Sequence, residues 1–442
     1  MSCVCSDGEG RAWSVEMNGW FVSLTVSLAL VASMAAPPAA VPQAALDDFL
    51  RGRVAAGDVP AVVAMVVDRH STTYAGAFGK QNVAQKRDLR LDAIFRIASM
   101  TKPVTSLAAM MLYEEGKLSF DDPVTKFLPE LANRRVMTTW HAADNTYESR
   151  SPKRVITVRD LLTHTSGIGY PFADARLAKL SAAGTAEADL PLLHDPGERF
   201  TYGPSTALVG RIVEKIAGEP LDQFFRSRIF DPLEMADTFF VLPPDKRDRV
   251  VTVHTRAADG SLVERPNPPE LRSDARGDGG LFSTAADYSR FMQLFLNGGR
   301  TRSGRLVKEQ TLRTMTSNQI GALVVREQPT AQPAVARPFP IGAGKDKFGF
   351  GFQIEAPPAA PGMRSVDSLS WGGIDNTHFW IDPRESIAAV VLMQLLPYYD
   401  DRALAVLRGF ERTVYGRIVG GAAPPLKRDP AADAQQPPHH NR

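Results

Sequence analysis

The stretch 95–117 constrains the structure and the chemistry of this chain more than any other segment. It places a serine and a lysine at the start of an apolar pattern with helical spacing. Ser99 and Lys102 are three positions apart, which puts their side chains on one face of a helix. Apolar residues continue to Leu112, and Gly116 is a typical end of a helix. The stretch therefore predicts a buried helix whose first turn holds a hydroxyl within reach of an amine.

This pairing has a chemical and a structural interpretation. A serine at a helix N-terminus lies near free backbone N–H groups and the positive end of the helix dipole. A lysine amine beside it, in apolar surroundings, is one way in which a hydroxyl becomes a nucleophile without histidine. The alternative is that Ser99 only caps the helix and Lys102 is solvated, since caps of this type are common. The motif alone leaves both interpretations open.

The composition limits what such a site can be. The 442-residue chain is 44% hydrophobic and 23% charged with a net charge of +2, which is typical of a globular protein and offers no basic surface for nucleic acid. Its two cysteines, Cys3 and Cys5, precede the predicted body of the protein, so that body has no disulfide, thiolate metal site or cysteine nucleophile. The sequence has no His-Glu-x-x-His spacing, and we expect neither a metal nor another cofactor.

The N-terminal segment has the features of an export signal. Residues 20–36 form an apolar run, but this run is too short and too rich in serine and threonine to indicate a membrane-spanning helix. Ser33 and Ala35 fit the small-residue pattern of a cleavage site. We therefore predict a leader or signal segment over 1–36 and a periplasmic or secreted protein, with an uncleaved anchor or a disordered leader as the alternatives. No other stable membrane partner is expected.

The remaining chain shows one long body and a short tail. The tail 421–442 is rich in proline, alanine, glutamine and histidine and is predicted to be disordered. Two stretches, 134–154 and 319–347, lack periodicity and are predicted to be long loops. Helices are predicted over 44–55, 206–217, 284–297 and 401–415, and strands over 61–68, 72–77, 348–355, 368–371 and 387–394.

Three further positions are candidates for a functional site. Tyr202 lies in a turn directly before a predicted helix, where a side chain is a catalytic candidate and an aromatic packing anchor is the alternative. The two glycines after Trp371 would let a backbone approach a ligand closely, and the glycine-rich turn 277–283 is expected to bring backbone close to the site. His164 ends a short predicted helix, and there we expect a structural hydrogen-bonding role rather than a general base.

Taken together, these segments resemble the serine β-lactamase-like hydrolases, a family of class C β-lactamases, D-alanyl-D-alanine peptidases and family VIII carboxylesterases. The resemblance covers about 46–420 and rests on the segments 95–102, 161–167, 196–202, 279–287 and 371–373 with 379–383. It implies an α+β fold of the β-lactamase/transpeptidase type, with an antiparallel sheet flanked by helices and a mostly helical lobe over about 117–283. The predicted hydrolase domain spans 44–420.

The resemblance also implies a role for each motif residue. Ser99 would be the acylated nucleophile, Lys102 its amine partner, and Tyr202 the relay that carries the proton to and from the serine and the leaving group. The cationic Lys102 would favour a phenolate-like Tyr202 through charge proximity. The backbone N–H groups of Ser99 and Ile374 would form the oxyanion hole. The substrate-binding strand opposite the serine would hold Trp371, Gly372 and Gly373.

Two departures from the family pattern indicate the substrate class. Pro204 stands where the second motif usually has asparagine, and Trp371 stands where true β-lactamases have lysine. Both changes remove groups suited to β-lactams and spare the acylation machinery, so the sequence predicts a carboxylesterase that acts on a small-molecule ester. The alternatives are a β-lactamase or D-alanyl-D-alanine carboxypeptidase, and a catalytically silent peptidoglycan- or partner-binding protein. Should Tyr202 not relay the proton, His164 and His378 are the next candidates.

Overall fold

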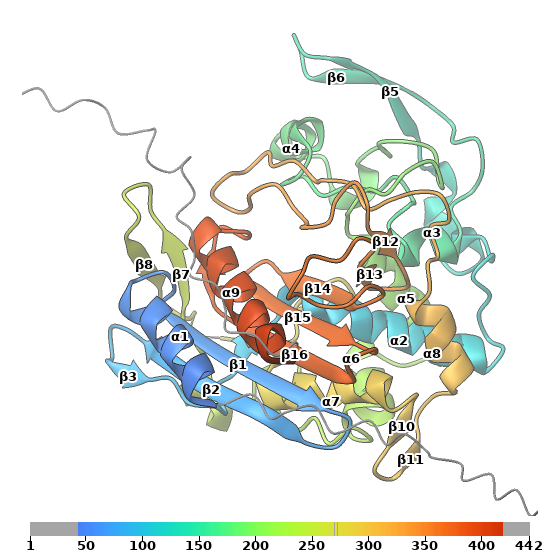
Figure 1. The fold of residues 1–442 in the computed structure, drawn as a ribbon. Helices are drawn as coiled ribbons and strands as arrows, with labels where there is room; N and C mark the ends of the chain where they lie inside the picture. The colour runs from blue at the N-terminus through green and yellow to red at the C-terminus, as the bar shows by residue number, and fades with distance from the viewer. Residues whose placement is uncertain (1–42, 269, 272, 419–442) are drawn as a thin grey trace, which may run out of the picture. The chain divides into compact units, whose positions relative to one another are not determined.

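The computed structural model describes residues 43–268, 270–271 and 273–418 (Figure 1). The leader predicted over 1–36 and the tail predicted over 421–442 lie outside the described residues, so both stay predictions. Within the described ranges, no helix is long and apolar enough to cross a membrane.

An eight-stranded antiparallel sheet joins the beginning and the end of the described chain. Its order is β12-β13-β14-β15-β16-β1-β2-β3. The strands are β12 (Lys347–Phe348), β13 (Gln353–Ile354), β14 (Leu369–Gly373), β15 (Thr377–Asp382), β16 (Ile387–Leu392), β1 (Ala61–Asp68), β2 (Thr72–Asn82) and β3 (Arg87–Asp88). The central pairing of β1 with β16 places Val66 opposite Ala389.

Both faces of the central strand β1 are buried, which explains its continuous apolar run. Val62, Ala64 and Val66 belong to one core cluster, and Val63, Met65 and Val67 belong to the other. Successive side chains of a strand point to opposite faces, so each half of the run fills a different core.

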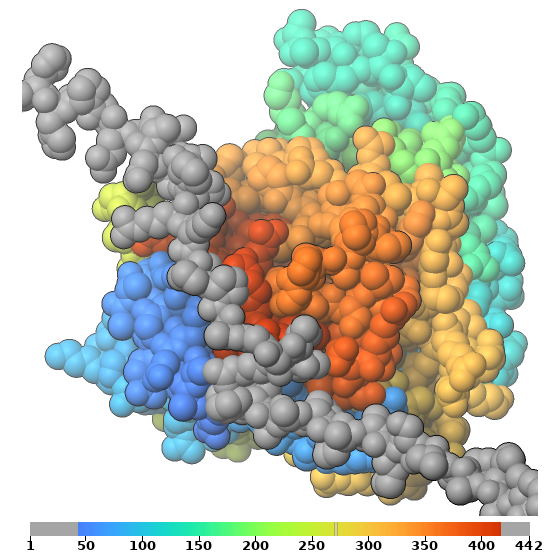
Figure 2. Space-filling model, in the orientation of Figure 1, coloured from blue at the N-terminus to red at the C-terminus, as the bar shows by residue number. Residues whose placement is uncertain are grey.

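Helices from the two ends of the described chain cover one face of the sheet. Helix α1 (Gln43–Ala55) packs against α9 (Asp401–Ile418), and both contribute to the core cluster that contains Leu46 and Phe410. Figure 2 shows these first and last segments, in blue and red, on one face of the molecule. Helix α7 (Ala285–Leu296) packs on the opposite face, over β1 and β16. The antiparallel sheet flanked by N- and C-terminal helices is therefore confirmed.

The remaining elements form the region beside the sheet. The helices are α2 (Thr101–Glu114), α3 (Val158–Leu162), α4 (Ala175–Ala182), α5 (Ser205–Ala217), α6 (Leu221–Phe225) and α8 (Glu309–Thr316). The strands are β4 (Phe95–Arg96), β5 (Val136–His141), β6 (Thr146–Arg150), β7 (Val253–Arg256), β8 (Leu262–Arg265), β9 (Phe282–Ser283), β10 (Arg300–Thr301), β11 (Gly304–Arg305) and β17 (Leu395–Leu396).

The structure corrects two sequence predictions and adds one strand that was not predicted. The stretch 134–154 is not a loop, because β5 and β6 form a hairpin that projects from the molecule (Figure 1). Most of its side chains are not buried on either face, so the apolar alternation that signals a strand is missing. The run 348–355 is not one strand, because β12 and β13 pair with each other across a turn. Strand β15 was not predicted, although it lies in the middle of the sheet.

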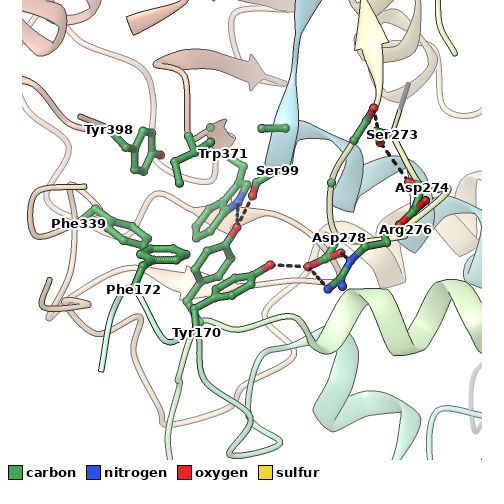
Figure 3. Close-up of a pocket in the computed structure, with 16 residues that line it drawn as sticks. Ser99, Tyr170, Phe172, Ser273, Asp274, Arg276, Asp278, Phe339, Trp371 and Tyr398 are labelled. Atoms are coloured by element: carbon green, nitrogen blue, oxygen red, sulfur yellow. Dashed lines mark hydrogen bonds and ion pairs between the residues drawn. The ribbon is translucent and has the colours of Figure 1, made fainter. Parts of the chain in front are cut away.

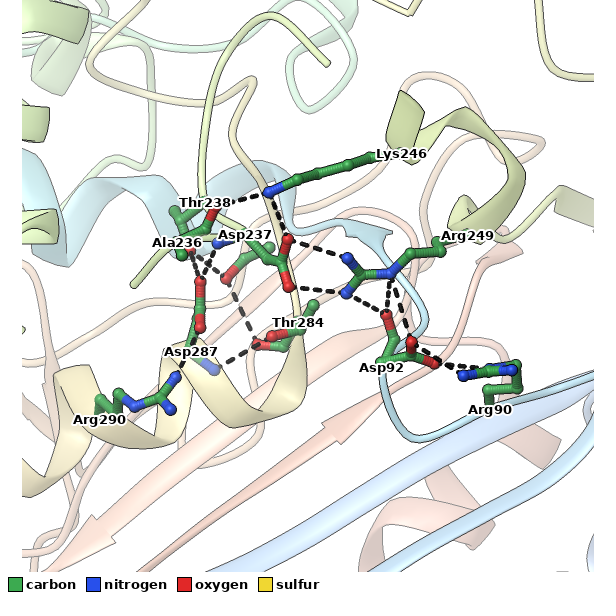
Figure 4. A network of polar contacts seen from close by, with 11 residues as sticks. Arg90, Asp92, Ala236, Asp237, Thr238, Lys246, Arg249, Thr284, Asp287 and Arg290 are labelled. Atoms are coloured by element: carbon green, nitrogen blue, oxygen red, sulfur yellow. Dashed lines mark hydrogen bonds and ion pairs between the residues drawn. The ribbon is translucent and has the colours of Figure 1, made fainter. Parts of the chain in front are cut away.

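A polar network fixes the segments around β4 and α7 (Figure 4). The guanidinium of Arg249 donates to the carboxylate of Asp237 and to the backbone carbonyl of Asp92. Lys246 donates to the same carboxylate at 2.7 Å, and the backbone N–H of Asp237 donates to Asp287 on α7 at 2.7 Å. The network therefore ties the loop before β4 to the N-terminus of α7.

Candidate active site

Ser99 lies in a short 3₁₀ turn (Ala98–Met100) that leads directly into α2. Its neighbour Ala98 has a φ of +43°, a conformation that L-residues rarely adopt, so the turn is held by its surroundings. Helix α2 is buried without interruption from Thr101 to Leu112, as the apolar pattern predicts. Lys102, in the first turn, is 1% exposed, and its Nζ donates to Ser99 Oγ at 3.0 Å.

Tyr202 approaches the same serine from the segment before α5. Its hydroxyl lies 2.7 Å from Ser99 Oγ, and Lys102 Nζ lies 4.7 Å from the centroid of its ring. The backbone N–H of Tyr202 donates to Gln328 Oε1 at 3.0 Å, which fixes the turn. The structure thus brings together the three side chains to which the sequence assigns catalytic roles.

Two residues that sequence reasoning did not select complete the surroundings of Lys102. Its Nζ also donates to the hydroxyl of Tyr170 at 3.2 Å and to the backbone carbonyl of Asp278 at 2.7 Å. Tyr170 in turn donates to Asp278 Oδ2 at 2.6 Å (Figure 3). The only signals in the sequence were the glycine-rich turn that contains Asp278 and the position of Tyr170 just after the His-Thr-Ser-Gly segment.

The charges in this group are set by burial and by neighbours. Burial raises the pKa of Asp278, but the charge of Lys102 and hydrogen bonds from Arg276 and Tyr170 outweigh it and hold the pKa below its usual value. Burial and the Asp278 charge raise the pKa of Tyr170 well above its usual value. At neutral pH the carboxylate is therefore ionised and Tyr170 keeps its proton.

Strand β14 forms the opposite wall. The indole N–H of Trp371 donates to the hydroxyl of Tyr202 at 3.4 Å. Gly373 lies so close to the carbonyl oxygen of Ile97 that a Cβ would overlap it. This close approach brings the end of the strand next to the turn that carries Ser99, and Ile374 lines the same cavity as the serine.

Ser99 and Tyr202 line a cavity of about 410 Å³ (Figure 3), and Lys102 lies buried behind them. Aromatic side chains form much of its wall: Tyr170, Phe172, Tyr202, Phe339, Trp371 and Tyr398. Of the lining residues that the structure describes, Arg276 alone carries a positive charge, and its guanidinium bonds to Asp278 and Glu187. No group of three or more His, Cys, Asp or Glu side chains that could hold a metal occurs within 43–268, 270–271 and 273–418.

The two histidines do not take part in this arrangement. The imidazole of His164 packs 4.9 Å from the ring of Tyr202, and its buried Nδ1 has no hydrogen-bond partner among the described residues. Its backbone carbonyl, not its ring nitrogen, accepts from Thr201. Burial and the Lys102 charge lower the pKa of His164 well below its usual value. Burial and Arg364 lower the pKa of His378 to about 3. Both rings are therefore neutral at physiological pH.

Comparisons with known proteins match most of the chain. Residues 46–411 match the family described as Beta-lactamase. The lovastatin esterase of Penicillium rubens is 28% identical over 84% of this chain and 98% of its own length. The monacolin J acid methylbutanoyltransferase of Aspergillus terreus is 28% identical over 87% of this chain and 98% of its own length.

A solved structure extends this likeness to the fold. A variant of simvastatin synthase from Aspergillus terreus superposes with a TM-score of 0.73 at 27% identity and covers 87% of this chain and 97% of that one. The predicted α+β fold of the β-lactamase/transpeptidase type is thereby confirmed.

Proposed function

Because the chain belongs to the beta-lactamase family, we propose that it is a serine hydrolase that cleaves carboxylic esters through an acyl-enzyme on Ser99. One observation carries the proposal: Ser99 Oγ lies within hydrogen-bond distance of both Lys102 Nζ and the Tyr202 hydroxyl, at 3.0 and 2.7 Å, beside an aromatic cavity. A hydroxyl with an adjacent base that is itself oriented by a third group is the arrangement of an activated nucleophile.

In the proposed mechanism Tyr202 moves the protons. Its oxygen takes the proton of Ser99 as Oγ attacks the ester carbonyl carbon, and it returns that proton to the alcohol when the ester C–O bond breaks. In this proposal Tyr202 begins as a phenolate, and the positive charge of Lys102 and the indole N–H of Trp371 stabilise its negative charge before it takes the proton and again after it gives the proton away. A water molecule, deprotonated by the same tyrosine, then attacks the acyl carbon. The bond from that carbon to Ser99 Oγ breaks, the tyrosine returns the proton to Oγ, and the acid is released.

The backbone N–H groups of Ser99 and Ile374 hold the oxyanion in this proposal. Each such donor contributes on the order of 2.7–4 kcal/mol in a transition state of this kind. The support is positional, because both residues line the cavity and Gly373 lets the end of β14 approach the serine turn.

The cavity favours a neutral ester over a carboxylate-bearing β-lactam or peptide. A cation would stabilise a carboxylate in this apolar cavity, but the guanidinium of Arg276 is already bonded to Asp278 and Glu187. Trp371 occupies the strand position where β-lactamases have lysine, and Pro204 offers no side-chain amide. The names of the curated esterase and transferase relatives support the same substrate class.

A paired initial-rate assay on one purified batch tests the proposal. We expect turnover of p-nitrophenyl acetate or butyrate and little hydrolysis of a chromogenic cephalosporin. A fluorophosphonate probe should label the wild type and not Ser99→Ala. The reverse substrate preference would place the chain with the β-lactamases, and an unlabelled wild type would favour a silent binding protein.

A second candidate function is acyl transfer, which the relative named as a methylbutanoyltransferase favours. An alcohol in place of water would attack the acyl-enzyme, Tyr202 would take its proton, and a new ester would leave. Adding an alcohol to the butyrate assay tests this. A butyrate ester of that alcohol supports transfer, and butyric acid as the sole product rejects it.

A further inference from the structure

We propose that Tyr170 and Asp278 are positioning residues that orient Lys102 toward Ser99 and balance its charge, and that the reactivity of Ser99 depends on them. This inference rests on the proposed function, because it concerns the same nucleophile. It adds two residues that do not belong to the serine–lysine–tyrosine motif.

In each hydrogen bond around Lys102, the amine is the donor and its partner is the acceptor. An ammonium has three N–H groups, and Nζ faces three acceptors: Ser99 Oγ at 3.0 Å, the Tyr170 hydroxyl at 3.2 Å and the Asp278 carbonyl at 2.7 Å. Tyr170 uses its own hydrogen to donate to the Asp278 carboxylate at 2.6 Å, so its oxygen is left to accept from the amine. The Tyr170 hydroxyl therefore accepts one N–H of Lys102 and the Asp278 carbonyl accepts a second. The third N–H is thereby directed at Ser99 Oγ.

The same pair supplies the counter-charge that a buried amine requires. Lys102 is 1% exposed and Asp278 is 7% exposed. An unpaired charge in such surroundings is strongly unfavourable, so the carboxylate stabilises the ammonium through the intervening phenol. The other titratable groups that face Lys102 are the phenol of Tyr202 and the imidazole of His164, and the imidazole is neutral because burial lowers its pKa.

Arg276 keeps the carboxylate in place. Its guanidinium donates to Asp278 Oδ1 at 3.0 Å and reaches outward to Glu187 at 2.9 Å. The carboxylate is thus held between Tyr170 on its inner side and Arg276 on its outer side (Figure 3). A chain of polar contacts leads from the surface residue Glu187 to the nucleophile, and only its inner part is buried.

Two conservative variants and their combination test the pair. Tyr170→Phe removes the hydroxyl and keeps the ring, and Asp278→Asn removes the charge and keeps the backbone carbonyl. The readouts are the rate constant for labelling of Ser99 by a fluorophosphonate, and kcat and KM with p-nitrophenyl butyrate. Matched controls are Tyr113→Phe, at the far end of α2, and Asp189→Asn, in the same outer turn as Glu187.

We expect each single variant to lower the labelling rate constant and kcat about 10–100-fold, the range for a lost hydrogen bond to a charged group. KM should change by less than about threefold, and the controls should match the wild type. The double variant should be no more than about threefold slower than the slower single variant, because both residues act through Lys102.

The opposite outcomes overturn the inference. Three results would each reject a shared positioning role. The first is that both single variants have a labelling rate constant and a kcat within twofold of the wild type. The others are an effect confined to KM, and effects of the two substitutions that multiply in the double variant. If Asp278→Asn does not fold, Tyr170→Phe alone decides. An active wild type with unaffected variants rejects only this inference, whereas a wild type that neither labels nor turns over ester removes the proposed function and this inference with it.

Discussion

The indole N–H of Trp371 points at the hydroxyl oxygen of Tyr202 across 3.4 Å. Strand β14 therefore touches the proposed proton relay directly, and the two rings lie 5.0 Å apart, tilted at 56°. An indole offers a neutral donor where a lysine would offer a charge. The relay tyrosine thus lies between the ammonium of Lys102 and an uncharged N–H group.

Trp371→Phe isolates that N–H group. The ring contact with Tyr202 is kept and one neutral hydrogen bond is lost, which corresponds to a factor of about 3–10 in kcat. KM with p-nitrophenyl butyrate should change little, because the cavity wall remains aromatic. Initial rates measure the effect, with Trp140→Phe on the hairpin strand β5 as the control for loss of an indole. A kcat equal to that of the wild type would show that the contact plays no part in proton transfer.

Tyr202→Phe should lower kcat far more than Trp371→Phe does. It removes the group that takes and returns the proton, and general acid–base groups contribute on the order of 10²–10⁴ in rate. Lys102→Ala should fall in the same range, and Ser99→Ala should show no turnover while its thermal unfolding stays close to that of the wild type. Full activity in Tyr202→Phe would assign the relay to another group.

The motif residues and their surroundings differ in how far the sequence could predict them. Ser99 and Lys102 are local to one another, so helical spacing alone brings them together. Tyr170 and Asp278 reach Lys102 from positions 68 and 176 residues away in the chain. Such contacts depend on how distant segments pack, and no periodicity within either segment records them.

The strands that were not predicted lack a clear apolar pattern in the sequence. The hairpin of β5 and β6 is stabilised by its own pairing, with Trp140 opposite Tyr147, and has little buried surface to impose an alternating pattern. Strand β1 was predictable because it is buried on both faces and its apolar run is continuous. Burial leaves a signal only where the buried residues are apolar: β15 is buried along its whole length, but Thr377, His378 and Asp382 flank its apolar residues, so no long apolar run marks it.

Asp237→Asn should destabilise the folded state relative to the wild type. The loss of stability should be larger at neutral pH than in acid. Burial raises the pKa of Asp237, but hydrogen bonds from Arg249 and Lys246 outweigh it, and the pKa lies below its usual value of 3.8. A carboxyl group whose pKa is lower in the folded state stabilises it above the unfolded-state pKa and loses that contribution as the pH falls toward the folded-state pKa.

The expected loss is about 1 kcal/mol in the free energy of unfolding at pH 7, between the values for an exposed ion pair and for a buried charged hydrogen bond. The difference from the wild type should be constant from pH 7 to 5 and shrink below about pH 4. Denaturant unfolding at several pH values measures it. The exposed carboxylate variant Asp231→Asn is the control. A difference that grew in acid would reverse the sign assigned to Asp237.

Gly373→Ala should damage catalysis without unfolding the protein. A Cβ at this position would overlap the carbonyl oxygen of Ile97 and the hydroxyl of Thr377. Thr377 can rotate, but Ile97 is backbone in the segment that leads to Ser99, so β14 must move away from the serine turn. The N–H of Ile374 moves with it. Loss of one oxyanion donor lowers kcat by about 10²–10³-fold, and a partial displacement should cost at least about tenfold.

The matched control is Gly52→Ala in helix α1, where a Cβ would have no heavy atom within 4 Å. That variant should keep the wild-type kcat and gain about 0.5–1 kcal/mol of stability, because alanine is the better helix former. Both variants are compared by kcat with p-nitrophenyl butyrate and by thermal unfolding. If Gly373→Ala turned over ester at the wild-type rate, the close approach of β14 to Ile97 would not position the oxyanion donor. If it lost activity only in proportion to lost folded protein, the glycine would serve packing rather than catalysis.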